Sequence, residues 1–218
     1  MDFTEVKSVV LLFLTVFSVP CPFRMAFSPN VANLTAWYFP DDDEIVQEKP
    51  ARPHMTDKKV SQKQLADFGV LAAEVKQPKS WDEDTNLQEI RKNRGYQSHD
   101  TVDCSSLSDD TKVKFFTEHL HVDEEIRLIT NGIGYFDIRD PEDKWIRIRI
   151  GTGALIILPP GIWHRFCVSE EDGCLKAVRL FTNEPKWTAY PRDGSAEDDV
   201  IKSARDEYHN IRKIEIAA

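Results

Sequence analysis

The stretch HLHVDEEIRLITNGIGYFDI, residues 119–138, decides the fold. Within it the spacing of apolar residues changes from helical to two-fold, which is the pattern of a half-buried strand. Residues two apart in a strand project to the same face, so His119 and His121 can point together, and Glu125 can join them. His164 arrives from a later predicted strand. Three imidazoles and one carboxylate suit a divalent first-row metal ion such as iron, nickel, manganese or zinc, and do not suit calcium.

The half of the chain after His119 is predicted to be an antiparallel barrel or sandwich, because turn signals recur about every eight to twelve residues. Asn131-Gly132 predicts a tight hairpin between strands at Ile126–Thr130 and Ile133–Ile138, since both turn residues tolerate positive φ. A half-exposed strand is expected at Trp145–Ile150. Further strands are expected at Ala154–Leu158, Trp163–Val168 and Cys174–Phe181, the last two pairing around the turn SEEDG.

The half before His119 is predicted to be mainly helical. A short strand with an acidic turn is expected at Thr35–Asp43, followed by a polar connector to Lys59. Gly95 is placed to form a left-handed C-terminal cap. The predicted helices are Ser61–Val75, Asp82–Arg94, a third from Ser108 that turns Val113, Phe115 and Phe116 to one side, and a surface helix in the charged tail after Asp193.

Composition excludes several classes of protein. The 218 residues include 28 basic and 37 acidic ones, and the net charge of -9 argues against binding to nucleic acid. The four cysteines form no Cys-x-x-Cys pair, so a reducing compartment is expected. Cys167 and Cys174, the pair closest in sequence, are therefore predicted to be free thiols.

Residues 1–24 are expected to lie outside the fold. The apolar run Val9–Val19 resembles the core of a signal peptide, but it is too short to span a bilayer. Asp2 and Glu5 precede it and no small-residue cleavage site follows it, so secretion is not favoured. An extension from an upstream start, with Met25 as a second start, is preferred to a targeting signal or a structural segment.

Two motifs resemble those of the cupin superfamily. The first is His-x-His, three residues, Glu, six residues, Gly at 119–132, and the second is Gly, five residues, Pro-x-Gly, two residues, His at 153–164. Val113 and Val168 stand where the superfamily usually has glycine and asparagine, and neither position holds a metal ligand. The resemblance implies a mainly β fold, a cupin-type double-stranded β-helix (jelly-roll) barrel with N-terminal helices and a C-terminal helical tail.

Longer segments narrow the resemblance to the acireductone dioxygenase family of methionine salvage. They are AWYFPDDD, FFTEHLHVDEEIRLITNGIGYFDIRD, KWIRI, LPPGIWHRF and RLFTNEPKWTAYPR, and they span roughly Ala36–Arg192. The resemblance implies cleavage of acireductone, the enediol 1,2-dihydroxy-3-keto-5-methylthiopentene, by O2. With iron it implies 4-methylthio-2-oxobutanoate and formate as products, and with nickel 3-methylthiopropionate, formate and carbon monoxide. One Fe(II) or Ni(II) per chain is expected on His119, His121, Glu125 and His164.

Arg127 is the expected catalytic and substrate-binding cation. It lies two residues beyond Glu125 on the same strand face, where a permanent positive charge can hold an enediolate oxygen. An arginine on the strand surface is the alternative. Glu118 and Glu124 are expected either to contact the ligand side chains without binding the ion themselves or to face solvent.

Three aromatic residues match positions that line the substrate pocket in the family. They are Phe115, Phe166 and Trp187, which suit a methylthio group and the exclusion of water. For each of them, plain core packing is the alternative.

The expected division of the chain is an extension at 1–24, a cupin dioxygenase domain at 25–192 and a helical tail at 193–218. A cytoplasmic monomer is expected, with the nucleus as a second location, acting on a small molecule and O2 without a membrane span. The competing functions are a cupin isomerase or another oxygenase with the same ligands, and a regulatory cupin without catalysis. The sequence leaves open which ion is bound, the oligomeric state, any protein partners and the role of residues 1–24.

Overall fold

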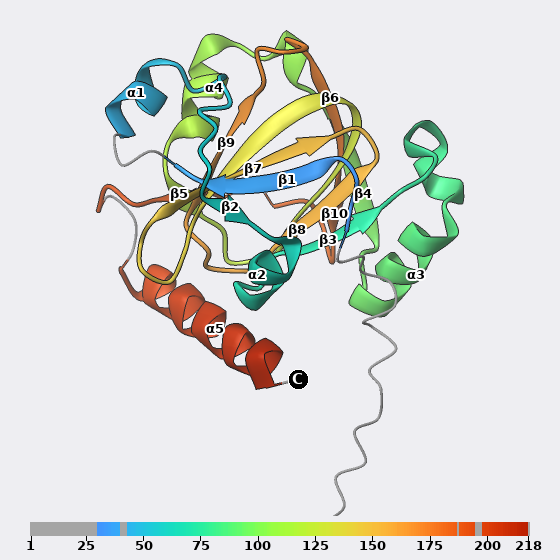
Figure 1. The fold of residues 1–218 in the computed structure, drawn as a ribbon. Helices are drawn as coiled ribbons and strands as arrows, with labels where there is room; N and C mark the ends of the chain where they lie inside the picture. Colours follow the sequence, from blue (N-terminus) through green and yellow to red (C-terminus); the bar gives the residue numbers. More distant parts are fainter. Residues whose placement is uncertain (1–29, 40–42, 187, 195–197, 218) are drawn as a thin grey trace, which may run out of the picture.

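The computed structural model describes residues 30–39, 43–186, 188–194 and 198–217, and it shows two antiparallel sheets that form a barrel around a shared strand (Figure 1). The antiparallel barrel agrees with the prediction from the sequence. The predicted apolar extension, the boundary at Met25 and Trp187 lie outside the described residues.

The first sheet has the strand order β11-β5-β9-β6-β7-β1-β2. Its strands are β1 (Leu34–Tyr38), β2 (Lys59–Val60), β5 (His119–Leu120), β6 (Glu125–Arg139), β7 (Trp145–Gly151), β9 (His164–Val168) and β11 (Tyr190–Pro191). The second sheet shares β6 and has the order β3-β8-β6-β10-β4. Its other strands are β3 (Leu71–Glu74), β4 (Ser98–Asp103), β8 (Ala154–Leu158) and β10 (Leu175–Phe181).

β6 passes without a turn through Asn131-Gly132, so the predicted hairpin is wrong. The first part of β6 pairs with β8 and β10, and the part from Ile133 onward pairs with β7 and β9. The hairpin turn needs positive φ at both central residues, and here Gly132 has it (φ 84°) while Asn131 does not. Gly132 instead bends one continuous strand from the second sheet into the first.

The predicted pairing of β9 with β10 around the turn SEEDG is also wrong. Both strands pair with β6, but β9 does so in the first sheet and β10 in the second. The turn between them therefore connects the two sheets. Cys167 and Cys174 are both free thiols in the structure.

The outer face of the first sheet carries a buried charge cluster. Arg147, expected on a half-exposed strand, has no exposed surface, and its Nε donates to Asp137 at 2.7 Å. Arg165 donates to the same carboxylate at 2.9 Å. The guanidinium of Arg147 also donates to the carbonyl oxygens of Pro50 and Arg52, so the chain between β1 and β2 covers this cluster. Burial of both arginines is possible because their charges and N–H groups have partners.

The helices agree in part with the prediction. They are α1 (Asp43–Glu48), α2 (Gln62–Asp67), the 3-10 helix η2 (Pro78–Glu83), α3 (Thr85–Arg94), the 3-10 helix η3 (Cys104–Ser106), α4 (Asp109–Phe116) and α5 (Asp198–Ala217). The Gly95 cap is confirmed, with φ 72° and its N–H donating to Arg91. Ser108 caps α4, as expected. Val113, predicted to lie on one side of this helix with Phe115 and Phe116, is 66% exposed, whereas the two phenylalanines are half-buried.

The helix predicted at Ser61–Val75 is too long. It ends at Asp67, because Gly69 adopts a left-handed conformation (φ 83°) and the chain turns there. Leu71–Glu74 then form β3, which pairs with β8. α1 and β4 were not predicted, because both are short and mostly polar in sequence.

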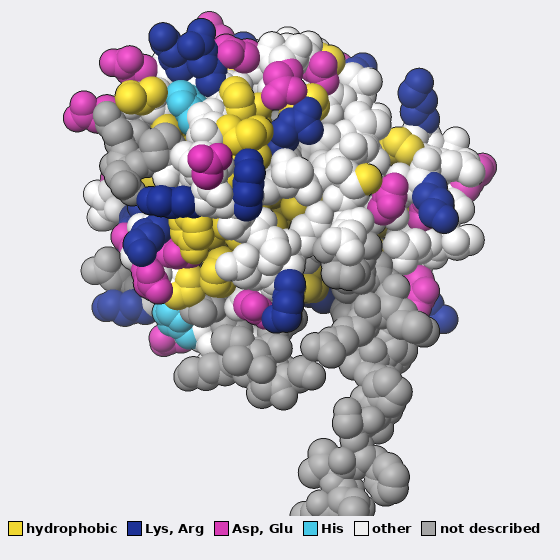
Figure 2. Space-filling view, in the orientation of Figure 1, with side chains coloured by type: hydrophobic (Ala, Val, Ile, Leu, Met, Phe, Trp, Pro, Cys, Tyr) yellow, Lys and Arg dark blue, Asp and Glu magenta, His cyan; other side chains and the backbone are white. Residues whose placement is uncertain are grey.

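The C-terminal helix α5 lies against one end of the barrel (Figure 1). Ala204 and Tyr208 are buried in the contact, and Arg205 donates to the carbonyl of Gly161 at 2.9 Å. None of the helices in the described ranges has the length and apolar character needed to cross a membrane. Basic and acidic side chains are interspersed over the face of the molecule in Figure 2.

Replacing Gly132 with alanine tests the bend in β6. A Cβ at Gly132 would overlap the carbonyl oxygen of Cys174, and the positive φ adds strain. We expect Gly132→Ala to lower the free energy of unfolding by about 2–4 kcal/mol in a urea titration. The control is Gly173→Ala, which also has positive φ but no atom near the added carbon, and should cost about 1 kcal/mol. Equal losses in the two variants would contradict the role given to Gly132.

Candidate metal centre

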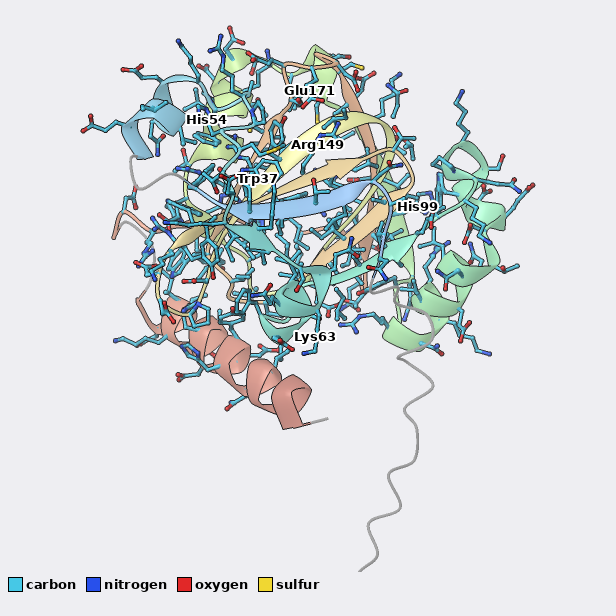
Figure 3. The ribbon with its side chains drawn as sticks, in the orientation of Figure 1. Trp37, His54, Lys63, His99, Arg149 and Glu171 are labelled. Atoms are coloured by element: carbon cyan, nitrogen blue, oxygen red, sulfur yellow. The ribbon has the colours of Figure 1, made fainter. Side chains whose placement is uncertain are left out.

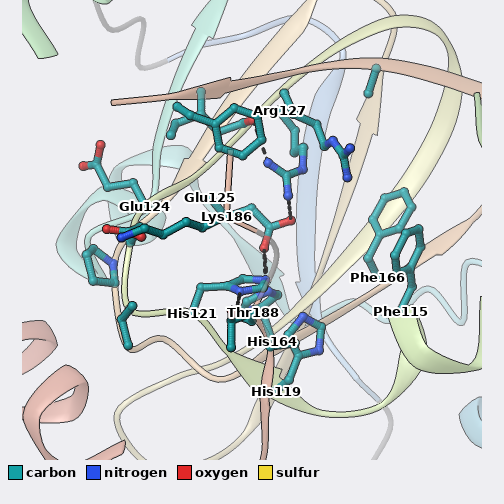
Figure 4. A pocket seen from close by; sticks show the side chains of 18 of the residues that line it. Phe115, His119, His121, Glu124, Glu125, Arg127, His164, Phe166, Lys186 and Thr188 are labelled. Carbon is teal, nitrogen blue, oxygen red and sulfur yellow. Dashed lines mark hydrogen bonds and ion pairs between the residues drawn. The ribbon is translucent and has the colours of Figure 1, made fainter. Parts of the chain in front are cut away.

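Three strand ends bring the predicted ligands together. His119 opens β5 and is paired across the sheet with His164, the first residue of β9. His121 follows β5 directly, and Glu125 is the first residue of β6. Figure 4 shows the four side chains converging at one end of a pocket. The structure therefore gathers the four residues selected from the sequence.

The ligand atoms are close enough to share one ion. One atom from each of the four side chains lies within 4.8 Å of the others. Two opposite ligands with metal bonds of about 2.1 Å would be about 4.2 Å apart, so a small contraction suffices. Oε2 of Glu125 is 2.7 Å from Nε2 of His164 and 3.4 Å from Nε2 of His121.

Two of these atoms are buried without a hydrogen-bond partner. Nε2 of His164 and Oε2 of Glu125 are each shielded from solvent, yet neither makes a well-directed hydrogen bond within the described part of the chain. Leaving such atoms unsatisfied costs free energy, unless an ion binds them. This observation shows that the residues present fit a metal ion.

Backbone carbonyls orient the three imidazoles. Nδ1 of His119 lies 2.7 Å from the carbonyl oxygen of Thr117, and Nδ1 of His164 lies 2.9 Å from that of Ile162. Nδ1 of His121 lies 2.6 Å from the carbonyl oxygen of Thr188. A carbonyl only accepts, so each Nδ1 carries the proton, and each neutral ring presents the lone pair of Nε2.

The electrostatics keep the rings of His119 and His121 neutral and the carboxylate of Glu125 charged. Burial, and then the neighbouring His164 and His121, lower the pKa of His119 to about 3. Burial also lowers the pKa of His121. Burial alone would raise the pKa of Glu125, but Arg127 and then His164 outweigh it and hold that pKa well below its usual range. These are the protonation states that metal ligands need.

Arg127 lies beside the ligand carboxylate. Its Nη2 is 3.0 Å from Oε1 of Glu125, and its Nη1 donates to the carbonyl oxygen of Ile126 at 3.0 Å. The pairing occupies Oε1 and leaves Oε2 for the ion. Arg127 also lines the pocket.

The four predicted ligands line a pocket with a volume of about 610 Å³, which we call the main cavity. Phe115 and Phe166 form part of its wall, with ring centroids 6.4 Å apart in an edge-to-face arrangement. The segment between β10 and β11 forms another part, including Lys186 and Thr188. The cavity is thus apolar on the phenylalanine side and charged near Arg127 (Figure 4).

The two glutamates next to the ligands both have basic partners. Glu118 binds Arg139 through two hydrogen bonds of 3.1 Å and also binds Arg192 at 2.8 Å. Glu124 forms an ion pair with Arg94 and accepts a hydrogen bond from Tyr96. Both carboxylates therefore tie the segment that carries three of the ligands to the rest of the fold.

Some residues of the site were missed in the sequence. The carbonyls of Thr117, Ile162 and Thr188 leave no signal, because any residue supplies a carbonyl. Arg94 and Tyr96 lie far from the motifs in sequence. Only their position on either side of the predicted helix cap at Gly95 could have directed attention to them.

Comparison with known proteins supports one family. The sequence model of the ARD/ARD' family matches residues 35–189. Acireductone dioxygenase 1 of Physcomitrium patens is 47% identical over 163 residues, which cover 73% of this chain and 82% of that protein. Acireductone dioxygenase of Rattus norvegicus is 47% identical over 173 residues, covering 77% of this chain and 93% of that protein.

A solved structure supports the fold. The acireductone dioxygenase from Bacillus anthracis, with a cadmium ion in its active center, is 24% identical and superposes with a TM-score of 0.52. The match covers 63% of this chain and 95% of that one. At this identity the likeness shows the fold alone, and it confirms the predicted cupin-type barrel. On the evidence of the family match and of relatives that align over most of their length, the chain belongs to the acireductone dioxygenase family.

Proposed function

We propose that this chain is a metal-dependent dioxygenase that cleaves acireductone with O2 in methionine salvage. The observation that carries the proposal is the orphaned pair of buried ligand atoms, Oε2 of Glu125 and Nε2 of His164, at one end of the main cavity. Family membership supports the same activity. All four ligand residues are present, which disfavours a regulatory cupin without catalysis.

The proposed ion is Fe(II) or Ni(II), one per chain, on His119, His121, Glu125 and His164. Three imidazole nitrogens and one carboxylate oxygen suit either ion. With iron, acireductone and O2 give 4-methylthio-2-oxobutanoate and formate. With nickel they give 3-methylthiopropionate, formate and carbon monoxide. Both sets of products account for every atom of the substrate and of O2.

The chain's own residues bind and orient the substrate. When bound, the ion supplies Lewis acidity and a template for the enediol oxygens. Arg127 fixes Glu125 through Oε1 and offers its free N–H groups to an enediolate oxygen, which favours the ionised substrate. Phe115 and Phe166 provide an apolar wall for the methylthio end and exclude water from the reacting carbons. Trp187 remains a proposed third member of this wall.

We also propose a cytoplasmic location, where thiols stay reduced. The free state of Cys104, Cys167 and Cys174 supports it. The division into an extension at 1–24, a cupin domain at 25–192 and a tail at 193–218 is likewise part of the proposal.

The direct test is oxygen consumption with enzymatically generated acireductone. Purified protein is stripped of metal, reconstituted separately with iron and with nickel, and the products are identified by mass spectrometry and gas analysis. Iron-loaded protein should yield formate with the 2-oxo acid, and nickel-loaded protein should release carbon monoxide. Absence of oxygen consumption with both ions would refute the proposed function.

Removing any one ligand should remove the metal. We expect His119→Ala, His121→Ala, Glu125→Ala and His164→Ala each to weaken metal binding by more than about tenfold. Removing a residue that only hydrogen-bonds to a metal ligand can already weaken binding by about tenfold, so removing a ligand itself should weaken it further. Metal content after dialysis is the measurement. The control is His99→Ala, because His99 is exposed on β4 and packs edge to face with Trp81 away from the site (Figure 3). Full metal content in any two of the four variants would contradict the site.

Arg127→Lys should retain metal and lose activity. Lysine keeps the charge but not the planar fork that holds Glu125 and a substrate oxygen at once. We expect kcat/KM to fall by about tenfold or more, the cost of one charge-assisted hydrogen bond. The matched control is Arg149→Lys, since Arg149 pairs with Glu171 on the outside of the barrel (Figure 3). Unchanged kinetics in Arg127→Lys would make Arg127 a purely structural residue.

A further inference from the structure

The barrel wall contains a seam that side chains close in place of strand pairing. β5 has two residues and pairs with β9 at His119 and His164. From Arg165 to Val168 this edge of β9 has no partner strand among the described residues, and α4 packs against it. A wall without a hydrogen-bonded ladder can open by rotation of side chains alone, without breaking backbone hydrogen bonds.

A second cavity lies on the outer side of this seam. We call it the seam cavity, and its volume is about 600 Å³. It is bounded by α4, by β9 and by the chain just after α1. Its apolar lining includes Pro50, Leu107, Val113, Phe115, Phe116 and Val168. The exposed position of Val113 is explained by its place on this lining.

The charged groups of the seam cavity already have partners. The Nε of Arg165 donates to Asp137 at 2.9 Å, and its guanidinium stacks on Phe116 at 4.3 Å. Glu118 is held by Arg139 and Arg192, and Lys112 pairs with Asp109 at 3.0 Å. The cavity therefore offers mainly apolar contacts, and a charged or strongly hydrated ligand would gain little there.

Phe115 and Phe166 separate the two cavities, because both residues line both of them. Each ring is half-buried, and they meet edge to face. Phe166 also packs on Phe136 inside the barrel, with ring centroids 4.8 Å apart. This pair of rings is the wall that a small molecule would cross to reach the metal ligands (Figure 4).

We propose that the seam cavity binds dioxygen and is its route to the metal centre, with Phe115 and Phe166 as the gate. The inference rests on the proposed dioxygenase function. With the organic substrate in the main cavity, the seam cavity offers the second reactant a separate approach. Dioxygen is neutral, small and apolar, so it partitions into an apolar cavity and can pass rotating rings that keep out bulk water.

The first test fills the seam cavity from its rim. Val113→Trp on α4 and Leu107→Trp on the preceding loop both project bulk into it, and neither residue belongs to the proposed catalytic or substrate-binding set. The matched control is Ile45→Trp, another exposed apolar residue, which lies on α1 and lines neither cavity. Each full-length, metal-loaded variant is assayed over a range of oxygen concentrations.

We expect kcat/KM for O2 to fall by about threefold or more in the two seam variants. The KM for acireductone and the kcat at saturating oxygen should stay at the parent values. Ile45→Trp should match the parent in every parameter. An unchanged oxygen dependence in Val113→Trp, with the fold and metal content intact, would overturn the route.

The second test does not depend on catalysis. Crystals of the full chain are pressurised with xenon, an inert apolar gas, and the xenon sites are located by diffraction. Xenon should occupy the seam cavity of the parent and be absent from it in Val113→Trp. A parent that binds no xenon there overturns the gas site. A parent that binds xenon but consumes no oxygen overturns the proposed function and the dioxygen route with it, while the apolar gas site stands.

Discussion

The pairing of β6 with four other strands is the constraint on which the metal centre depends. β6 begins in the second sheet, bends at Gly132 and ends in the first. Its first residue, Glu125, and the residue two positions on, Arg127, face the cavity because the strand ladder fixes their phase. Further along, Ile138 pairs with His164, so the same strand also places a ligand of the other sheet.

Alternation along β9 links the metal centre to the buried charge cluster outside the barrel. His164 faces the main cavity, and the next residue, Arg165, faces outward to Asp137. A slip of β9 by one residue would exchange the two faces. Asp137, which has no exposed surface, would then lose a partner, and breaking a buried ion pair costs about 3–5 kcal/mol. The cluster therefore favours the register that presents His164 to the ion.

The ligand set could be predicted from the sequence because strand geometry converts spacing into direction. His119, His121 and Glu125 are spaced for one strand face, although the structure distributes them over two strands and the link between them. The predicted hairpin at Asn131-Gly132 was wrong because the signal for a turn is local, whereas the path of β6 is set by partners distant in sequence. Gly69 marks the end of α2, but Leu71 and Ala72 continue the helical spacing of apolar residues beyond it. The predicted helix therefore extended over the residues that form β3.

Other parts of the site leave little trace in single residues. Arg94 and Tyr96 reach Glu124 only because α3 ends beside the ligand loop, which depends on tertiary packing. The seam between α4 and β9 exists because β5 has only two residues and leaves the rest of this edge of β9 without a partner strand in the described part of the chain. No single residue in the sequence indicates where β5 ends.

The three imidazoles are oriented by carbonyls of the main chain, which has a consequence for the inheritance of the site. A point mutation replaces side chains and leaves carbonyl groups in place, so Thr117, Ile162 and Thr188 can change identity while the rings keep their tautomers. Substitutions at these three positions should therefore leave the orientation of the imidazoles unchanged. His119 and His164 each use a carbonyl two positions away, whereas the carbonyl partner of His121 lies 67 positions away. The orientation of His121 is therefore the one that insertions or deletions in the intervening chain can disturb.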